Sequence, residues 1–385
     1  MSINPYTSAP LNLGHIPVLY TERGFEESIL KYITPQHPVE KQNIIIEGEK
    51  GIGKTTLITK IQFQLKQEKK RLPLLYSLTQ MTNYRWFLTD VLKKSLEFQA
   101  KNMVSGEEES KLMALLQNDT KLRYVNTGTL ESYFVQYTTG DIILIIDNAN
   151  YILTNMPELK NLIISQGFTM SPILILCFVD NDLTSFMEKD TMGFFDRFGT
   201  TLKISKMTYP QVEDMIEKRL AWTNMEDIKL ESFLAHNQLQ NIYSYFQGFP
   251  RGIISVCRNL YDKYLQSGNV TDIDVSKEIV SYQNKVSSRR LARLNDFKKE
   301  IVTSIYNADE EIVYRDIFTQ ITNEEKPKSK ANLSIALSEL VADGIVIKVD
   351  KGIYSLADDI HHLLDEVGNV DKLREYTAHI SNEDI

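Results

Sequence analysis

The sequence predicts an α/β fold, a parallel sheet with helices on both faces, followed by a helical lid and a C-terminal winged helix. Three observations lead to this prediction. Apolar segments without polar alternation recur through the first half of the chain, which is typical of strands buried on both faces. A glycine-rich loop links one of them to a helical pattern. Near the C-terminus, two short strand patterns flank a tight turn.

The expected parallel strands are short and strongly apolar. They cover residues 43–47, 72–78, 142–146, 173–179 and 201–204. Helical patterns lie between them, among others at residues 55–67, 84–100 and 107–117. Strands that alternate with helices in this order predict βαβ units and therefore a parallel sheet.

The strand pattern stops after residue 209, and only helical patterns follow for about eighty residues. These expected lid helices cover residues 210–222, 230–236, 239–246 and 252–266. A polar, basic stretch at residues 284–293 then leads into a third unit.

The third unit has the pattern of three helices followed by a hairpin. The helices are expected at residues 296–306, 313–321 and 330–342, and the strands at 345–349 and 353–356. Asp350-Lys351-Gly352 favours a hairpin turn between those strands. This order is typical of a winged helix. A generic helical cap with a hairpin is the alternative.

Length and composition indicate a folded protein of two or three domains, with 385 residues of which 42% are apolar and 24% charged. We expect domains at residues 1–207 (the parallel sheet and its helices), 208–290 (helical lid) and 294–366 (winged helix), with a tail at 367–385. No apolar run approaches the ~20 residues of a membrane span, and no secretory signal is visible.

Charge and cysteine content bear on partners and location. The formal net charge of −8 argues against indiscriminate binding of nucleic acid, but it leaves room for a local basic surface. The only cysteines, Cys177 and Cys257, lie in apolar segments. We expect both to be reduced core residues, which indicates a cytoplasmic protein without membrane contacts.

Residues 48–55 match the P-loop pattern G-x-x-x-x-G-K-[ST] between a strand and a helix. Glycines there let backbone N–H groups curl around phosphate oxygens, helped by the helix N-terminus. Lys54 is expected to reach the β- and γ-phosphates, and the Thr55 hydroxyl to bind magnesium. The sequence therefore predicts ATP and Mg²⁺ as cofactors. The expected nucleotide-binding residues are Gly48, Glu49, Lys50, Gly51, Ile52, Gly53, Lys54, Thr55 and Thr56.

A P-loop site also needs a carboxylate at the end of a neighbouring strand to hold the magnesium shell. Asp147 follows the apolar segment 142–146 and is the second expected metal ligand besides Thr55. Asn148 comes next, where many ATPases have a Glu that activates the attacking water. A neutral amide orients water but cannot take its proton, so we expect slow hydrolysis. Asp180 is the alternative candidate base.

These residues, with motifs elsewhere in the chain, resemble the AAA+ class of ATPases, and within it the origin-recognition and archaeal replication-initiator lineage. The resemblance covers about residues 5–360. Asn4-Pro5-Tyr6 and residues 20–26 are similar to that lineage's N-terminal segment. The resemblance implies that this segment packs near the adenine and that Arg23 and Glu26 form an R-x-x-E box.

The resemblance implies roles for three more residues. Asn181, just after the fourth apolar segment, matches the sensor-1 residue that would bond the γ-phosphate or the water. Arg197 resembles the arginine finger, which reaches the ATP of a neighbouring subunit. Arg251 resembles sensor 2 of the lid, which contacts the γ-phosphate of its own ATP. A surface ion pair for Arg197 and a helix-start position for Arg251 are the alternatives. The expected catalytic residues are Lys54, Asp147, Asn148, Asn181, Arg197 and Arg251.

The third unit departs from the lineage's basic pattern. Residues 281–351 hold 12 Lys or Arg and 11 Asp or Glu, and no basic DNA-binding insertion is evident. Lys326, Lys328 and Lys330 nevertheless cluster at the start of the expected recognition helix, beside Asn332. The cations suit contact with DNA phosphates, and the amide suits a base edge. A solvated loop is the alternative.

We therefore expect an ATP-dependent switch that forms homo- or hetero-oligomers with ATP between subunits. It would act on double-stranded DNA with other proteins of a DNA-processing complex, as an initiator-like loader or a mobile-element regulator. Two alternatives remain open. One is a STAND-type signalling ATPase, of which Asp147-Asn148 and residues 51–57 are also typical. The other is an ATP-binding structural subunit of a larger assembly.

Overall fold

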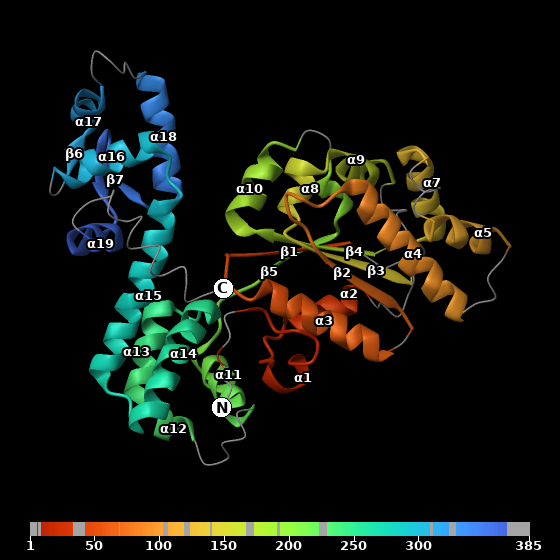
Figure 1. Ribbon diagram of the computed structural model, residues 1–385, viewed down its shortest axis with the longest axis horizontal. Coiled ribbons are helices and arrows are strands. Elements are labelled where there is room, and N and C mark those ends of the chain that lie inside the picture. Colours follow the sequence, from red (N-terminus) through yellow and green to blue (C-terminus); the bar gives the residue numbers. More distant parts are fainter. Residues whose placement is uncertain are drawn as a thin grey trace. The chain divides into compact units, whose positions relative to one another are not determined.

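The computed structural model describes residue 6 and residues 9–33, 43–68, 70–102, 107–118, 124–138, 141–166, 173–190, 193–222, 229–308, 311–322 and 329–367. The chain divides into two compact units, residues 1–269 and 270–385 (Figure 1). Within the described ranges, no helix is both long and apolar enough to cross a membrane.

The first unit is built on a five-stranded parallel sheet. Its strands are β1 (Ile44–Gly48), β2 (Leu72–Ser77), β3 (Ile142–Asp147), β4 (Ile173–Val179) and β5 (Thr200–Lys203). They lie in the order β2-β3-β4-β1-β5, and every neighbouring pair is parallel. The predicted parallel sheet is thereby confirmed, and each strand begins and ends within one residue of its expected position.

Alternate residues of the central strands pack into two separate hydrophobic cores. On β3, Leu144 joins one core while Ile143 and Ile145 join the other. Helices α4 (Tyr84–Asn102) and α7 (Thr127–Tyr137) contribute to the first core, and α2 (Phe25–Ile33) and α3 (Lys54–Glu68) to the second. Because both faces of the sheet are covered at its centre, β3 and β4 carry no polar alternation, whereas the edge strand β5 alternates half-buried and exposed residues.

Several shorter elements complete the sheet layer. They are α1 (Ile16–Leu19), α5 (Glu107–Leu116), α8 (Asn150–Asn155), α9 (Pro157–Gln166), α10 (Asp180–Glu188) and the 3-10 turn η3 (Phe195–Arg197). Cys177 on β4 and Cys257 in the lid are both buried and unpaired, as expected for core residues.

Four helices after β5 belong to the same compact unit. They are α11 (Tyr209–Trp222), α12 (Leu230–Phe233), α13 (His236–Phe246) and α14 (Pro250–Ser267). Tyr6 packs among them, because its ring lies 6.0 Å from that of Phe233 and 5.7 Å from that of Tyr261. These helices confirm the predicted helical region, which we call the lid.

The second unit combines helices with a small antiparallel sheet. Its elements are α15 (Asp272–Ala292), α16 (Asp296–Tyr306), β6 (Ile312–Val313), α17 (Tyr314–Ile321), α18 (Lys330–Ala342), β7 (Val346–Asp350), β8 (Ile353–Leu356) and α19 (Asp358–Val367). The strands lie in the order β6-β8-β7. The expected helix order and the hairpin are present, with a third short strand added.

The polar stretch at residues 284–293, which leads into the third expected unit, forms the end of α15 and its C-cap, Arg293. Its polar side chains are used inside the unit. Asn284 donates to Glu366 Oε2 at 2.6 Å, and Ser287 donates to Asp359 Oδ2 at 2.5 Å, so α15 packs on α19 through hydrogen bonds. A polar stretch of sequence can therefore be helical and not a loop, because its buried polar side chains form hydrogen bonds with a neighbouring helix.

Gly248 is a point where the lid meets the end of the sheet layer. Its φ is +81°, and a Cβ there would lie 2.0 Å from the Met207 carbonyl oxygen. The Gly248 carbonyl in turn accepts a hydrogen bond of 3.1 Å from the Met207 N–H. Neither backbone can shift without breaking this contact.

We predict that Gly248→Ala destabilises the first unit by more than about 3 kcal/mol, because a backbone clash adds to the cost of a positive φ. Gly268→Ala is the matched control, since Gly268 also has a positive φ (+74°) but no atom within 4 Å of its Cβ position. Gly268→Ala should lower the free energy of unfolding by only about 1 kcal/mol. Urea unfolding measures both losses. Equal losses of the free energy of unfolding in the two variants would show that the Met207 backbone moves aside without cost, which would contradict the prediction.

Candidate nucleotide-binding site

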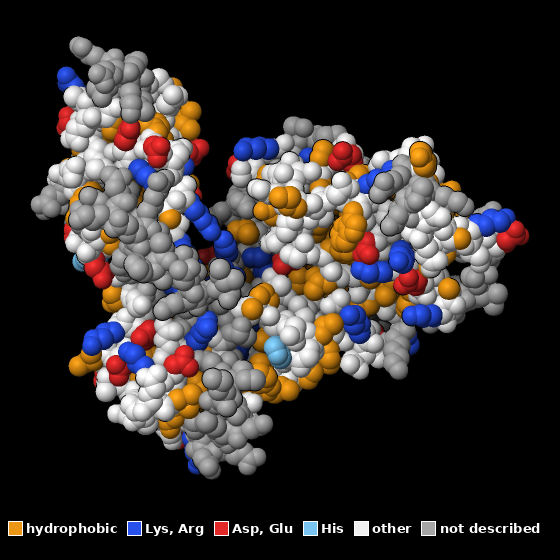
Figure 2. Space-filling model, viewed as in Figure 1, with side chains coloured by type: hydrophobic (Ala, Val, Ile, Leu, Met, Phe, Trp, Pro, Cys, Tyr) orange, Lys and Arg blue, Asp and Glu red, His pale blue; other side chains and the backbone are white. Residues whose placement is uncertain are grey.

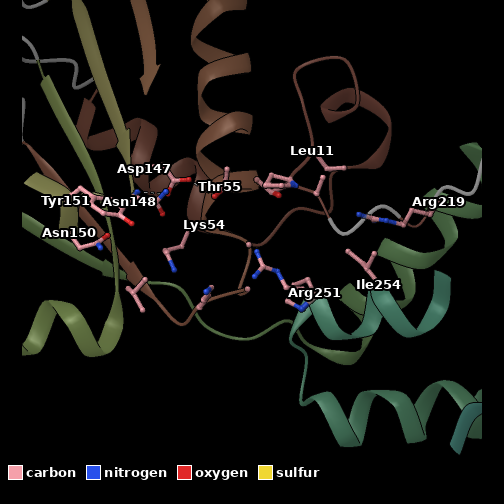
Figure 3. Close-up of a pocket in the computed structure, with 18 residues that line it drawn as sticks. Leu11, Lys54, Thr55, Asp147, Asn148, Asn150, Tyr151, Arg219, Arg251 and Ile254 are labelled. Carbon is pink, nitrogen blue, oxygen red and sulfur yellow. Dashed lines mark hydrogen bonds between the residues drawn. The ribbon is translucent and has the colours of Figure 1, made fainter. Parts of the chain in front are cut away.

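The loop between β1 and α3 lies along one side of a cavity (Figure 3). Gly51 and Gly53 have φ values of +91° and +100°, a conformation that L side chains rarely adopt. Because these glycines have no side chains, two arginine side chains can lie close to the loop. A Cβ on Gly51 would lie 3.4 Å from Arg251 Cβ, and one on Gly53 would lie 3.2 Å from Arg23 Nη1. The positive φ therefore requires glycine at both positions, and at Gly53 the Arg23 guanidinium would also have to move slightly to admit a Cβ.

Lys54 is the first residue of α3, where backbone N–H groups have no partner within the helix. Its ammonium donates to the carbonyls of Gly48, at 2.6 Å, and Glu49, at 3.0 Å. The side chain lines the cavity (Figure 3). A fixed cation and a helix N-terminus thus face the same space, an arrangement that favours phosphate.

Thr55, in the first turn of α3, and Asp147, the last residue of β3, meet at the carboxyl edge of the sheet. The Thr55 hydroxyl donates to Asp147 Oδ2 at 2.6 Å. Thr55 follows the loop after β1, and Asp147 ends β3, with β4 lying between these strands. The Asp147 side chain is buried, with 5% of the residue exposed. A hydroxyl and a carboxylate oxygen are ligands that suit Mg²⁺.

Asn148 has a left-handed backbone, with φ of +55°. Its backbone N–H donates to Asp147 Oδ1 at 3.0 Å. Its side-chain amide donates to Ser77 Oγ at 3.2 Å and to the Leu78 carbonyl at 3.4 Å, just after β2. Asn148 also lines the cavity, so a neutral amide lies at the position where a Glu would supply a general base.

The cavity has a volume of about 530 Å³, and nine of the residues predicted from the sequence line it. These are Lys50, Gly51, Gly53, Lys54, Thr55, Thr56, Asp147, Asn148 and Arg251. Gly48, Glu49 and Ile52 are not among its lining residues. Gly48 and Glu49 hold Lys54 through their carbonyls, and Ile52 is buried in the core below the loop.

Arg251 lies in the first turn of α14 and points toward the P-loop (Figure 3). Arg197 lies in η3 before β5 and does not line the cavity; its carbonyl accepts a 3.2 Å hydrogen bond from Asn43 Nδ2. Asn181 and Asp180 lie in the first turn of α10, and their side chains are outside the described part of the chain. The structure therefore joins Arg251, but not Arg197, to the P-loop.

Several lining residues were missed by the sequence reasoning. They include Ala9, Pro10, Leu11, Tyr151, Arg219 and Ile254. One of them carries a signal that the sequence does contain. Arg219 occupies a position in the buried stripe of α11, otherwise formed by Val212, Met215, Ile216 and Leu220. A cation within such a stripe is unusual and marks a residue with a specific partner.

Arg23, named in the sequence analysis with Glu26 as an R-x-x-E box, lies outside the cavity lining. Its guanidinium donates to the carbonyls of Ile52, in the P-loop, and Ser205, before the lid. Glu26 fixes this region, because its Oε1 accepts from the Arg23 N–H at 3.0 Å and from the Tyr20 hydroxyl. Burial lowers the pKa of the Arg23 guanidinium. Arg23 thus ties the P-loop to the segment that enters the lid.

The candidate DNA-contacting residues lie in the second unit. Lys330 and Asn332 are exposed in the first turn of α18, where the Asn332 N–H donates to Ser329 Oγ at 3.1 Å. Lys326 and Lys328 fall outside the described residues. On the face drawn in Figure 2, lysine and arginine side chains are scattered among acidic ones.

Both the sequence and the fold of this chain are similar to those of known proteins. Residues 37–181 match the family model described as an AAA domain. No curated protein matches the chain. Among solved structures, *Aeropyrum pernix* ORC1 in complex with DNA has a TM-score of 0.61 at 14% identity, covering 93% of this chain and 96% of that one.

Two further structures give similar values. *Aeropyrum pernix* ORC2, in its ADPNP and ADP complexes, has a TM-score of 0.56 at 14% identity, with 97% of this chain and 98% of that chain covered. The Walker-type ATPase of *Pyrococcus abyssi* has 0.55 at 14% identity, with 96% and 99% covered. At such identities the likeness concerns the fold. Residues 37–181 thus match an AAA domain, and the fold of the chain resembles that of the origin-recognition proteins.

Proposed function

We propose that this protein is an ATP-dependent switch that hydrolyses ATP slowly, self-associates through bound ATP and acts on DNA. The observation that carries the proposal is the Thr55–Asp147 hydrogen bond of 2.6 Å beside Lys54. It brings two hard oxygen ligands and a cation together next to a P-loop. This set of groups suits a magnesium–triphosphate complex.

Thr55 and Asp147 would hold the ion, which when bound neutralises charge on the phosphate oxygens. Within the described part of the chain, no group of three or more His, Cys, Asp or Glu could form a metal cage. That agrees with magnesium, which takes few protein ligands and fills its shell with phosphates and water. Lys54 and Arg251 would bind the phosphates from opposite sides, one from the P-loop and one from the lid.

Slow hydrolysis is supported by the groups that line the cavity. Among the described lining residues, Asp147 is the sole carboxylate, and its oxygens already accept from Thr55 and from the Asn148 N–H. The Asn148 side chain donates to Ser77 and cannot take a proton. With no free general base among the described lining residues, an attacking water would gain orientation but not deprotonation.

Self-association is supported by the position of Arg197. It precedes β5, the edge strand of the sheet, and does not line the cavity of its own subunit. An arginine placed there would serve the ATP of a neighbour, where its fork of donors suits phosphate.

The DNA-binding part of the proposal rests on the second unit. Its helix order and hairpin are those of a winged helix, with Lys330 and Asn332 exposed on α18.

We predict that Lys54→Ala and Arg197→Ala separate nucleotide binding from assembly. Lys54→Ala should abolish ATP binding and therefore ATP-dependent self-association, because it removes the cation at the P-loop. Arg197→Ala should bind ATP like the wild type but fail to assemble. Equilibrium binding of a fluorescent ATP analogue and sedimentation with a slowly hydrolysed analogue measure the two properties.

Circular dichroism serves as the control that both variants fold. A folded Lys54→Ala protein with wild-type ATP affinity would contradict the nucleotide site. An Arg197→Ala protein that assembles as well as the wild type would contradict the role at the subunit interface.

We predict that the wild type turns over well below the enzyme median of about 10 per second, and that Asn148→Glu raises the rate. The added carboxylate supplies a base where the amide supplies none, an effect worth about 10²-fold or more where geometry permits. Steady-state release of phosphate measures both rates. Asn148→Gln is the matched control, since it lengthens the side chain without adding a charge. A rate increase in Asn148→Gln equal to that in Asn148→Glu would refute the missing-base explanation.

We predict that neutralising Lys326, Lys328 and Lys330 weakens binding to every duplex sequence. The slope of the logarithm of the binding constant against the logarithm of the salt concentration should become shallower by up to about three, roughly one for each phosphate contact that is lost. Asn332→Ala should instead reduce discrimination between sequences with little change in that slope, because a base contact releases few counterions. Filter binding across a salt series measures both effects.

ATP-loaded wild-type protein that fails to retain duplex DNA at about 0.15 M salt would overturn the DNA-binding part of the proposal. The signalling or structural alternatives would then take its place, while the ATP site would stand on its own observations.

A further inference from the structure

Arg219 is a buried cation at the end of the cavity away from the P-loop. It lies on α11 with 3% of the residue exposed, and it lines the cavity. Its Nη1 donates to the Met215 carbonyl at 3.0 Å, one turn back on the same helix. Its Nε is buried and has no hydrogen-bond partner among the described residues. A strong donor is thus left for another acceptor.

The charge of this guanidinium is not balanced by an acid in the described part of the chain. The groups that act on its pKa are Tyr6 and Cys257, and burial outweighs them and lowers that pKa. Neither neighbour carries a charge at neutral pH, since burial raises the pKa of both. An arginine remains charged in proteins and has donors only. Burying it is costly unless an acceptor reaches it.

The walls beside Arg219 suit a flat, apolar group. Leu11 and Ile254 line the same end of the cavity, and Figure 3 shows them with Arg219 at the side opposite Lys54, Asp147 and Asn148. A nucleotide whose phosphates lie at Lys54 and Thr55 must extend its base in the other direction. The base would then lie between aliphatic side chains, within reach of the buried cation Arg219.

We propose that Arg219 reads the nucleotide base by donating a hydrogen bond from its guanidinium to a ring nitrogen of the purine. The inference rests on the proposed nucleotide site and adds a specificity-determining residue to it. Purine rings offer acceptors at N1, N3 and N7, and a donor-only side chain can pair with any of these but not with an N–H group. Arg219 is therefore a positioning and selecting group, not a catalytic residue.

The competing explanation is that Arg219 only packs the N-terminal segment onto the lid, since Tyr6 lies close to it. The two explanations differ in one respect. A packing residue affects stability and the affinity for all nucleotides alike. A base-reading residue affects the difference between a nucleotide and an analogue that lacks one acceptor.

The test measures binding of ATP and of 1-deaza-, 3-deaza- and 7-deaza-ATP to wild type and to Arg219→Met. Wild type should bind one analogue about tenfold more weakly than ATP, because a hydrogen bond from a charged donor is lost. Arg219→Met should bind ATP about as weakly as wild type binds that analogue, and it should bind the analogue and ATP equally. Lys218→Met removes a cation from the same helix that does not line the cavity, and it should keep the wild-type ratios.

Arg219→Lys guards against misfolding of the methionine variant, because it keeps the charge while removing the Nε donor. It should lose the same analogue discrimination. Analogue ratios that are identical in wild type and in both Arg219 variants would overturn the inference. A wild type that binds neither ATP nor any analogue would instead overturn the proposed nucleotide site, so the two failures are distinguishable.

Discussion

The hydrogen bond between Thr55 and Asp147 defines the site on which the other features of the first unit depend. It forms because parallel strands place all their carboxyl ends at one edge of the sheet, so residues 92 positions apart in sequence meet there. The P-loop must curl at that edge to bring Thr55 within reach, and the curl requires positive φ at Gly51 and Gly53. Lys54 is then directed across the loop. Sheet topology thus positions a cation and two oxygen ligands together.

The lid takes part in the site through backbone contacts as much as through side chains. Arg23 connects the Ile52 carbonyl with that of Ser205, just before the lid begins. Gly248 lies against Met207 and is followed within three residues by Arg251, which covers Gly51. Groups on both sides of the cavity therefore share a short, rigid backbone path. Ligand bound at the P-loop would restrict the lid through these contacts, which is what a nucleotide-dependent switch requires.

The sheet could be predicted almost residue by residue because strands buried on both faces have uniformly apolar sequences. The P-loop was evident because its chemistry demands glycines and a lysine at fixed spacing. The apolar end of the cavity was not evident from the sequence, since Leu11 and Arg219 lie far apart in sequence and line the same cavity only in the fold. The polar stretch at the end of α15 could not be recognised as helix packed in the second unit, because Asn284 and Ser287 form their hydrogen bonds with α19. Local pattern cannot reveal a partner distant in sequence.

The charge distribution around the cavity differs from that of the chain as a whole. The formal net charge is −8, yet the described lining residues include Lys50, Lys54, Arg219 and Arg251 against a single carboxylate, Asp147. A cavity of positive sign in an acidic protein concentrates anionic ligands there and not over the general surface. Lys54 and Arg251 flank the P-loop, where the charge of a triphosphate would lie. Arg219 lies at the opposite end, beyond that charge, so directional hydrogen bonding and not ion pairing would explain why a cation is buried there.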